Sequence, residues 1–435
     1  MEFRYSLIFD GHGLLFAGCV FFISRSVFIF SCGYMSREVQ KKRFGYLVVS
    51  FVASILFLIF SGNLIGVLLG WDGLGLTSFL LVIYYQNPYS FGAGIITALT
   101  NRLGDVGLIL SIRLLIDLGH WRGVFISDVP YMVLLIVYRG ALTKRAQYPF
   151  SSWLPMAMAA PTPVSALVHS STLVTAGVFL LIRFFNIIEF WGYRGFIVLL
   201  FVRSLTMVMA GLAAFVERDL KKIIAYSTLR QLGVIIMALG LGSPLLALFH
   251  LLSHALFKAL IFVCAGVFIH YHWHRQDVRL MGGLGKIFPV TQLGIVVSNL
   301  ALCGFPFLSG FYSKDPIYEI RVLGVARWFP IFFTVFGLFL TRAYSFRRLR
   351  FSQLGEMNQV ALRCFGNRVV YFTVPVYLLG AGAIRWGCIL NWILLPSTFL
   401  GPVRFFYGAI PVLLFMVVLS LAYLLNRGMG VDLIP

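Results

Sequence analysis

Two histidines and a lysine recur at every fourth position of one long apolar stretch: His250, His254 and Lys258. Side chains four residues apart lie on the same face of an α-helix, one above another. At about 1.5 Å per residue, the three groups would form a row about 12 Å long. Histidine gains and loses a proton near neutral pH, and a lysine releases its proton more readily when burial disfavours the charged form. The spacing therefore predicts a row of groups that pass protons.

Two other roles fit parts of this row. Histidines at i and i+4 can share a zinc ion, but the next residue on this face is Lys258 and no carboxylate follows at a suitable place, so we expect no metal. A single buried histidine is usually a structural part of a protein core. Three titratable groups on one face fit that role poorly, because a charge within an apolar stretch is costly.

Further titratable residues lie inside other apolar stretches, where a charge usually marks a proton or ion path. They are Asp72, Asp105, Lys144, His169, Lys314 and Asp315. We expect Asp72 and Lys144 to form a buried acid–base pair, and Arg102 to pair with Asp105, three positions along the same helix. Lys314 and Asp315 would end the path on one side. The simpler alternative for each group is a static ion pair or a charge at the membrane interface.

The composition indicates that a membrane surrounds these groups. The chain has 435 residues, of which 60% are hydrophobic and 11% are charged, and its mean hydropathy is +0.92. Soluble domains have about 45–50% apolar and about 25% charged residues, so a soluble enzyme, a disordered chain and a disulfide scaffold are excluded. The formal charge of +20 does not indicate nucleic acid as a partner, because the basic residues lie singly between apolar runs.

Long apolar runs recur along the whole chain. At about 20 residues per span, it has room for about 13 or 14 transmembrane helices. The runs are continuous, unlike the alternating segments of about ten residues in a barrel, so the predicted fold class is an all-α polytopic membrane protein. Ile287–Cys303 and Phe311–Leu323 are counted as two of these spans.

Two stretches contain helix breakers. Tyr131–Ala160 holds two prolines as well as Lys144, and Cys303–Lys314 holds two glycines and a proline. Proline removes a helical hydrogen bond and kinks the helix. Discontinuous helices are common in transporters that handle ions, so we expect a functional break at each place, with a plain structural kink as the alternative.

The basic loops predict an orientation. By span counting, Arg37–Arg43, Glu217–Lys222 and His272–Lys286 fall on one side, which the positive-inside rule places at the cytoplasm or the organelle matrix. Arg347–Arg350 falls on the other side in this count and contradicts the assignment.

Several motifs together resemble a known family. They are Gly70–Leu76, Asn101–Asp105, Pro149–Gly177, Asp219–Thr228, His250–Lys258 and Gly310–Asp315. These motifs resemble those of the antiporter-like subunit 5 family of mitochondrial NADH–ubiquinone oxidoreductase, respiratory complex I, in an invertebrate style. The likeness runs from about Ile8 to about Glu319, and its long second motif is highly specific.

The resemblance implies a proton-translocating subunit, multi-pass in the mitochondrial inner membrane, that couples electron transfer from NADH to ubiquinone to proton pumping. It implies an antiporter-like bundle with two inverted five-helix repeats, each containing one broken helix, around Lys144 and Lys314. The partners implied are other membrane-arm subunits, the lipid bilayer and protons, with no nucleic acid. No cofactor is expected in this chain, since NADH, FMN, the iron–sulfur clusters and ubiquinone would bind elsewhere in the complex.

The resemblance also assigns roles to the titratable residues. The family's conserved acid corresponds to Asp72, its pumping lysine to Lys144, the linking histidine to His169 and the exit lysine to Lys314. The central-axis groups correspond to the row on the 250–258 stretch, and Asp105 and Asp315 complete the proposed relay. On this basis the chain divides into residues 1–62, with N-terminal spans, 63–241, with a first half around Lys144, 242–345, with a second half, and 346–435, with a loop and the last spans.

The sequence departs from the family in three ways. Asp72 stands where the family has Glu, and Arg145 and Arg230 stand where it has Ser. There is also no room for the family's spans before Leu14 and after Leu425, nor for its long lateral helix, so we expect an incomplete gene model or a shortened subunit.

The arginines raise a separate hypothesis. The chain has 27 arginines and 8 lysines, and five arginines lie within apolar runs: Arg113, Arg139, Arg145, Arg203 and Arg230. A central arginine costs about 2.5–3.5 kcal/mol on insertion scales. Many invertebrate mitochondria read AGA and AGG codons as serine, so these positions would be serine if the translation used the wrong code. The alternative is true arginines that extend to the interface or line the polar path.

Two other functions compete with proton translocation in complex I. One is a stand-alone or multisubunit cation/proton antiporter, which shares the helical core, although sodium binding would want more membrane acids than this chain has. The other is a non-catalytic scaffold or a non-functional gene, which intact His254 and the intact lysines at 144, 258 and 314 argue against.

Overall fold

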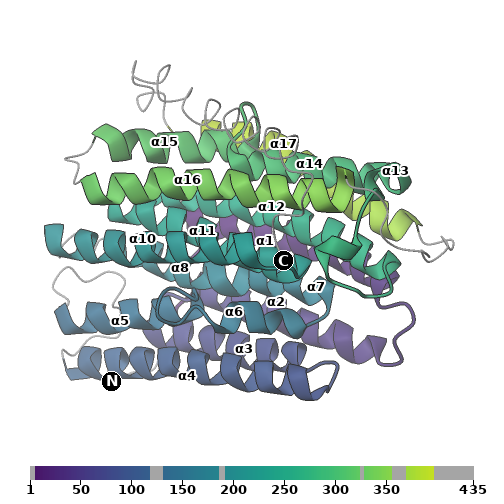
Figure 1. Ribbon diagram of the computed structural model, residues 1–435. Coiled ribbons are helices and arrows are strands. Elements are labelled where there is room, and N and C mark those ends of the chain that lie inside the picture. Colours follow the sequence, from purple (N-terminus) through teal and green to yellow (C-terminus); the bar gives the residue numbers. More distant parts are fainter. Residues whose placement is uncertain (1–4, 118–130, 186–191, 324–327, 355–368, 396–435) are drawn as a thin grey trace.

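The computed structural model describes residues 5–117, 131–185, 192–323, 328–354 and 369–395. These residues form helices that run nearly parallel to one another, and no β-strand occurs among them (Figure 1). The only ladder-type pairings in the described part are isolated bridges between loops. The predicted all-α polytopic fold is therefore confirmed.

Nine helical segments in the described part are long and apolar enough to cross a membrane. They are α1 (Gly11–Tyr34), α2 (Lys41–Phe60), α3 (Leu64–Val82), α4 (Pro88–Asp117), the segment Thr162–Arg183, α10 (Gly192–Val216), α11 (Leu220–Gly240), α12 (Pro244–Tyr271) and α17 (Val369–Leu394). Two broken crossings and α16 (Trp328–Leu349) add three more. The last predicted run, Phe406–Leu425, lies outside the described residues.

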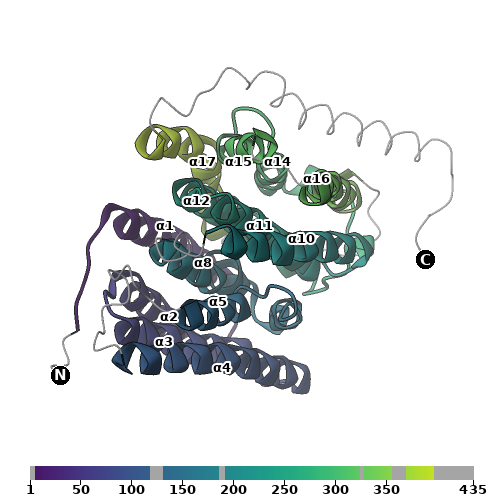
Figure 2. The same cartoon turned by 90° about the vertical axis from the view of Figure 1, so that its left-hand side faces the viewer.

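Helix α12 forms the centre of the bundle. All of its most apolar window is buried, whereas only 39% of the corresponding window is buried in α2 and in α4. Viewed along the helices, α2–α4 form one side, α5, α8 and α10–α12 follow, and α14–α17 form the other side (Figure 2). The row of titratable groups therefore lies on the helix that is most shielded from lipid.

Both predicted breaks are present. Helix α5 (Tyr131–Lys144) ends in irregular chain before α6 (Trp153–Met156) and the short helix η1 (Ala157–Ala159). Helix α14 (Pro289–Cys303) ends at Gly304, whose φ of 79° is left-handed, and α15 (Ser309–Leu323) follows beyond the end of α14 (Figure 1). Gly310 is required here, because a Cβ at this position would lie 1.8 Å from the carbonyl oxygen of Ala301.

The count of two spans in this region was wrong. Each of α14 and α15 has 15 residues, which is about 22 Å of helix and too short for a hydrocarbon core of about 30 Å. The two halves together form one crossing. The crossings form two successive series. The first is α2, α3, α4, α5/α6 and α8, and the second is α10, α11, α12, α14/α15 and α16. In each series the broken crossing is the fourth. These series begin at Lys41 and Gly192, whereas the division at residues 63 and 242 stays a prediction.

The single crossing corrects the position of the basic loops. The Leu220 amide donates to the carbonyl of Gln276 at 2.8 Å and the Val278 amide donates to that of Arg218 at 3.0 Å, so the segments 217–222 and 272–286 meet. Arg347 donates to the carbonyl of Phe215, which places Arg347–Arg350 at the same end, contrary to the sequence-based count. In the loop at this end, the hydrogen bond from Arg279 lowers the pKa of the Asp277 carboxyl.

The lysines lie either at this end of the bundle or in its interior. Five of the eight lie at this end of the bundle, and the other three lie inside it. Those at the end are Lys41, Lys42, Lys221, Lys222 and Lys286. The interior ones are Lys144, Lys258 and Lys314, which are at most 3% exposed.

Candidate proton path

An ion-pair cluster lies halfway along α3 and α4. Arg102 on α4 bonds to the carboxylate of Asp72 on α3 at 2.8 Å and to that of Asp105 on its own helix at 3.3 Å. The predicted pair of Arg102 with Asp105 is confirmed. The predicted direct pair of Asp72 with Lys144 is wrong, because the Asp72 side chain is turned toward α4 and is 41% exposed.

Lys144 ends α5 beside this cluster. Its Nζ donates to the backbone carbonyl of Trp71 at 2.5 Å and lies 3.9 Å from the centre of the Trp71 ring. Successive helical residues are about 100° apart around the axis, since there are 3.6 residues per turn, so a group at position 71 can face α5 while Asp72 faces α4. Asp105 and Asp72 are still near enough to act electrostatically on the amine.

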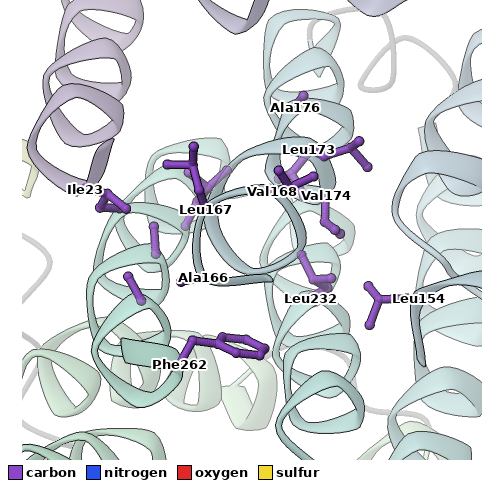
Figure 3. Packing of buried hydrophobic residues seen from close by; sticks show 14 of the residues in the cluster. Ile23, Leu154, Ala166, Leu167, Val168, Leu173, Val174, Ala176, Leu232 and Phe262 are labelled. Carbon is purple, nitrogen blue, oxygen red and sulfur yellow. The ribbon is translucent and has the colours of Figure 1, made fainter. Parts of the chain in front are cut away.

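His169 lies in a π-helical segment, η2 (Ser165–Thr172), between α7 (Thr162–Val164) and α8 (Leu173–Arg183). Wide turns of this kind occur frequently at functional sites. Here the Thr172 hydroxyl donates to the carbonyl five residues earlier, at 2.7 Å. In Figure 3, apolar side chains from four other elements pack around this segment: Ile23, Leu154, Leu232 and Phe262. The segment is thus fixed in the middle of the bundle.

Trp153 connects the first break to His169. Its ring centre lies 6.3 Å from that of His169, and its Nε1 donates to the carbonyl of Thr143 at 2.9 Å, next to Lys144. Neither ring nitrogen of His169 has a hydrogen-bond partner among the described residues. Buried polar atoms of this type normally bond to protein groups or to water.

The row on α12 forms as predicted. His250, His254 and Lys258 are all completely buried, and the two imidazole centres are 6.2 Å apart. The Lys258 Nζ donates to the Ser227 hydroxyl on α11 at 2.6 Å. Both nitrogens of His254 lack a hydrogen-bond partner in the described part of the chain. Three titratable groups thus follow one another through the apolar centre of the protein.

Lys314 lies on α15, which follows the second break. Its side chain is buried, and its Nζ donates to the carbonyl of Leu302 in the last turn of α14. The amine lies 5.7 Å from the ring centre of Phe257 on α12. Asp315 is half-buried beside it and acts on it electrostatically.

The structure therefore brings the predicted residues into two groups. The first contains Asp72, Asp105 and Lys144, and the second contains the α12 row with Lys314; His169 lies between them without a direct bond to either. Sequence reasoning missed the carbonyl of Trp71 and the hydroxyl of Ser227. It also missed the hydroxyl of Ser313, which lies 2.9 Å from Nδ1 of His250. Serine is common in membrane helices, so only the positions next to known charged groups could have indicated them.

The arginines divide by burial. Arg113 is 73% exposed and pairs with Asp117 at 3.7 Å, and Arg139 is exposed and lines a largely apolar cavity of about 560 Å³. Five arginines are at most 2% exposed, and the last two of them are not among the five that the sequence singled out: Arg145, Arg203, Arg230, Arg342 and Arg348. No described group accepts a hydrogen bond from the terminal nitrogens of Arg145, or from any guanidinium nitrogen of Arg342 or Arg348.

This fold and path define a class of protein: a multi-pass membrane protein with two broken crossings and buried titratable groups between them. The family model described as NADH:quinone oxidoreductase/Mrp antiporter, TM matches residues 61–341. The model described as NADH-Ubiquinone oxidoreductase (complex I), chain 5 N-terminus matches residues 1–45.

Two relatives and one solved structure agree with these matches. The chain is 48% identical over 400 residues to NADH-ubiquinone oxidoreductase chain 5 of Aedes aegypti, covering 91% of this chain and 69% of that one. It is 50% identical over 393 residues to chain 5 of Lumbricus terrestris, covering 89% and 68%. In the structure of the Mrp complex from Dietzia sp. DQ12-45-1b, a chain matches with a TM-score of 0.83 and 25% identity; the match covers 99% of this chain and half of that one.

The chain belongs to the family of NADH-ubiquinone oxidoreductase chain 5. This family supplies membrane subunits of the proton-translocating NADH:ubiquinone oxidoreductase of the mitochondrial inner membrane. The predicted family, activity and location are confirmed. The Mrp likeness shows that the same helical core serves a related antiporter complex.

Proposed function

We propose that the buried groups carry protons between the two broken crossings, as part of coupled NADH:ubiquinone oxidoreduction. The observation that carries this proposal is the row on α12, where His250, His254 and Lys258 are each completely buried in the most enclosed helix. A charge moved across 100 mV is worth about 2.3 kcal/mol. A modest change in the proton affinity of such a group is therefore enough to move a proton against that potential.

In this mechanism Lys144 is the proton-carrying group of the first half. Its bond to a neutral carbonyl, not to a carboxylate, allows the amine to lose its proton without leaving an anion unpaired. Asp72 and Asp105 both keep their bonds to Arg102 in either state, although its single positive charge leaves the three groups with a net charge of −1 when the amine is neutral. His169 connects this half to the α12 row through water-mediated bonds, and Lys314 with Asp315 forms the exit.

Replacing Lys258 with methionine tests the row. Methionine keeps the apolar length but loses the amine and its 2.6 Å bond to Ser227. We expect the complex to assemble and its proton pumping to fall about tenfold, which is about 1.4 kcal/mol in activation free energy. Proton uptake by proteoliposomes, measured beside NADH oxidation, gives the result; normal pumping by the assembled variant would make the row structural.

The α3/α4 face is the proposed contact with another membrane-arm subunit. Its middle carries the partly exposed Asp72–Arg102 pair among leucines that are at least 60% exposed: Leu69, Leu99 and Leu103. An ion pair facing lipid at this depth is costly, and a neighbouring subunit with polar groups would remove that cost.

A photo-reactive side chain at position 103 tests this contact. In the purified complex we expect it to capture a second membrane-arm subunit, identified by mass spectrometry. The matched control is position 209, where Met209 is similarly exposed at 59% on α10, a helix that lies apart from α3 and α4 (Figure 2); it should capture a different neighbour. Capture of lipid alone at position 103 would contradict the proposal.

The orientation and cofactor content are also proposals. The lysine-rich end of the bundle, with Lys41, Lys42 and Lys222, would face the mitochondrial matrix by the positive-inside rule. NADH, FMN, iron–sulfur clusters and ubiquinone would bind elsewhere in the complex. Co-purification with an inhibitor-sensitive NADH–quinone reductase supports this function, whereas purification as a separate cation/proton antiporter would favour the alternative.

A further inference from the structure

One hydroxyl joins the α12 row to the second broken crossing. Ser313 on α15 is completely buried, and its Oγ lies 2.9 Å from Nδ1 of His250 on α12. The Ser253 hydroxyl, also on α12, donates to the same Oγ at 3.0 Å. Ser313 is in turn placed to donate to the carbonyl of Ser309, at 3.2 Å. Three hydrogen-bonding groups thus converge on one oxygen.

This geometry allows the Ser313 hydroxyl two hydrogen-bonding arrangements. A hydroxyl has one proton to donate and two lone pairs that accept. When Nδ1 of His250 carries a proton, it donates to Ser313, which then donates to the Ser309 carbonyl. When Nδ1 is bare, Ser313 donates to it instead and releases the carbonyl. The bonding of Ser309 therefore depends on where the proton of His250 lies.

Ser309 and Ser313 form the first turn of α15, directly after the break that begins at Gly304. The next residue, Lys314, spans the break by donating to the carbonyl of Leu302. A change in the first turn of α15 is therefore transmitted to the segment that positions the Lys314 amine. Among the residues that the structure describes, the Lys314 amine and the His254 ring are the other titratable groups near His250.

We propose that Ser313 is a positioning residue that couples the proton state of His250 to the broken crossing α14/α15, and so to Lys314. It acts through His250 and Ser309 and carries no net charge itself. This inference rests on the proposed proton path, in which His250 and Lys314 both take part.

The test compares variants in the assembled complex in proteoliposomes. Ser313→Ala removes the hydroxyl; we expect pumping to fall about fivefold, the effect of losing one hydrogen bond of about 1 kcal/mol. Ser313→Thr keeps the hydroxyl and should restore most of the rate. The matched control is Ser298→Ala on α14, because Ser298 is equally buried and its hydroxyl bonds to a carbonyl of its own helix at 3.0 Å; it should pump normally.

A double-mutant cycle with His250→Gln separates coupling from a structural effect. If Ser313 acts through His250, Ser313→Ala should lower the rate of the His250→Gln complex less than twofold further. Full multiplication of the two single effects, or normal pumping by Ser313→Ala, would overturn the proposal. Failure of the path itself is distinguishable, because Lys258→Met would then also pump normally.

Discussion

Replacing Lys144 with methionine is expected to stop proton pumping while leaving the chain in the assembled complex. Lys144 is the amine that lies at the first break, and removing a proton-transferring side chain typically costs about 100-fold or more in rate. Methionine retains the apolar contact with the Trp71 ring, over which the amine lies at 3.9 Å. We therefore expect at least about 100-fold slower proton uptake, measured in proteoliposomes supplied with NADH and ubiquinone.

The ion-pair cluster explains why assembly should survive this change. Removing one partner of a buried ion pair usually costs about 3–5 kcal/mol, because the other charge is left uncompensated. Here Asp72 and Asp105 are bonded to Arg102, and Lys144 is bonded to a carbonyl. Removing the Lys144 amine therefore breaks no salt bridge, although the two carboxylates and one guanidinium then keep a net charge of −1.

The control for this experiment is Lys42→Met. Lys42 is exposed at the start of α2 and should be replaceable without effect on pumping. Native gel electrophoresis measures assembly for both variants. A Lys144→Met complex that assembles and pumps at the normal rate would exclude Lys144 from the path.

The sequence predicts those parts of the site that depend on one helix. The four-residue spacing of His250, His254 and Lys258 fixes their common face, whatever the helix packs against. The two breaks were also predictable, because proline cannot continue a helical hydrogen-bond pattern, and the left-handed Gly304 is a conformation that glycine adopts readily.

Features that depend on two helices were not predictable. Whether Asp72 faces Lys144 or Arg102 depends on the rotation of α3 relative to α4 and α5. This rotation could not be inferred from a single sequence. The sequence from Arg342 to Leu349 is rich in arginine and unlike an apolar span, yet α16 extends to Leu349, so the burial of Arg342 and Arg348 was not predicted. Similarly, each half of α14/α15 is apolar enough to look like a short span of its own.

Serine is the expected residue at positions 145, 230, 342 and 348 in the protein that mitochondria make. An arginine at the centre of a membrane helix costs about 2.5–3.5 kcal/mol, so arginines at positions 145, 230 and 342 alone would cost roughly 8–10 kcal/mol together. That is comparable with the whole stability of a typical protein, about 5–15 kcal/mol. No salt bridge to a carboxylate forms at any of the four among the described residues.

A serine at these positions could donate its hydroxyl proton to a carbonyl of its own helix and would need no partner on another helix. Buried serines near them already do so: Ser227 donates to the carbonyl of Ile224 at 2.6 Å, Ser345 to that of Arg342 at 2.9 Å, and Ser352 to that of Arg348 at 2.7 Å. The positions at which serine is expected therefore differ from the five that the sequence singled out: 145 and 230 are kept, and 342 and 348 are added. Arg113, with its partner Asp117, no longer supports the hypothesis.

Peptide mass spectrometry of the purified subunit decides the question, with the paired arginines as the internal control. Trypsin cleaves after Lys144, so the peptide that begins at position 145 should have the mass for serine there, and no cleavage should occur after position 145. Arg102, bonded to Asp72 and Asp105, and Arg183, bonded to Asp10 at 2.8 Å, should remain arginine, because a carboxylate compensates each charge. Codons AGA or AGG at the four positions and CGN at these two would agree with the peptides. An arginine mass at position 145, or a CGN codon there, would rule the substitution out and require an acceptor for a guanidinium at the first break, beside Lys144.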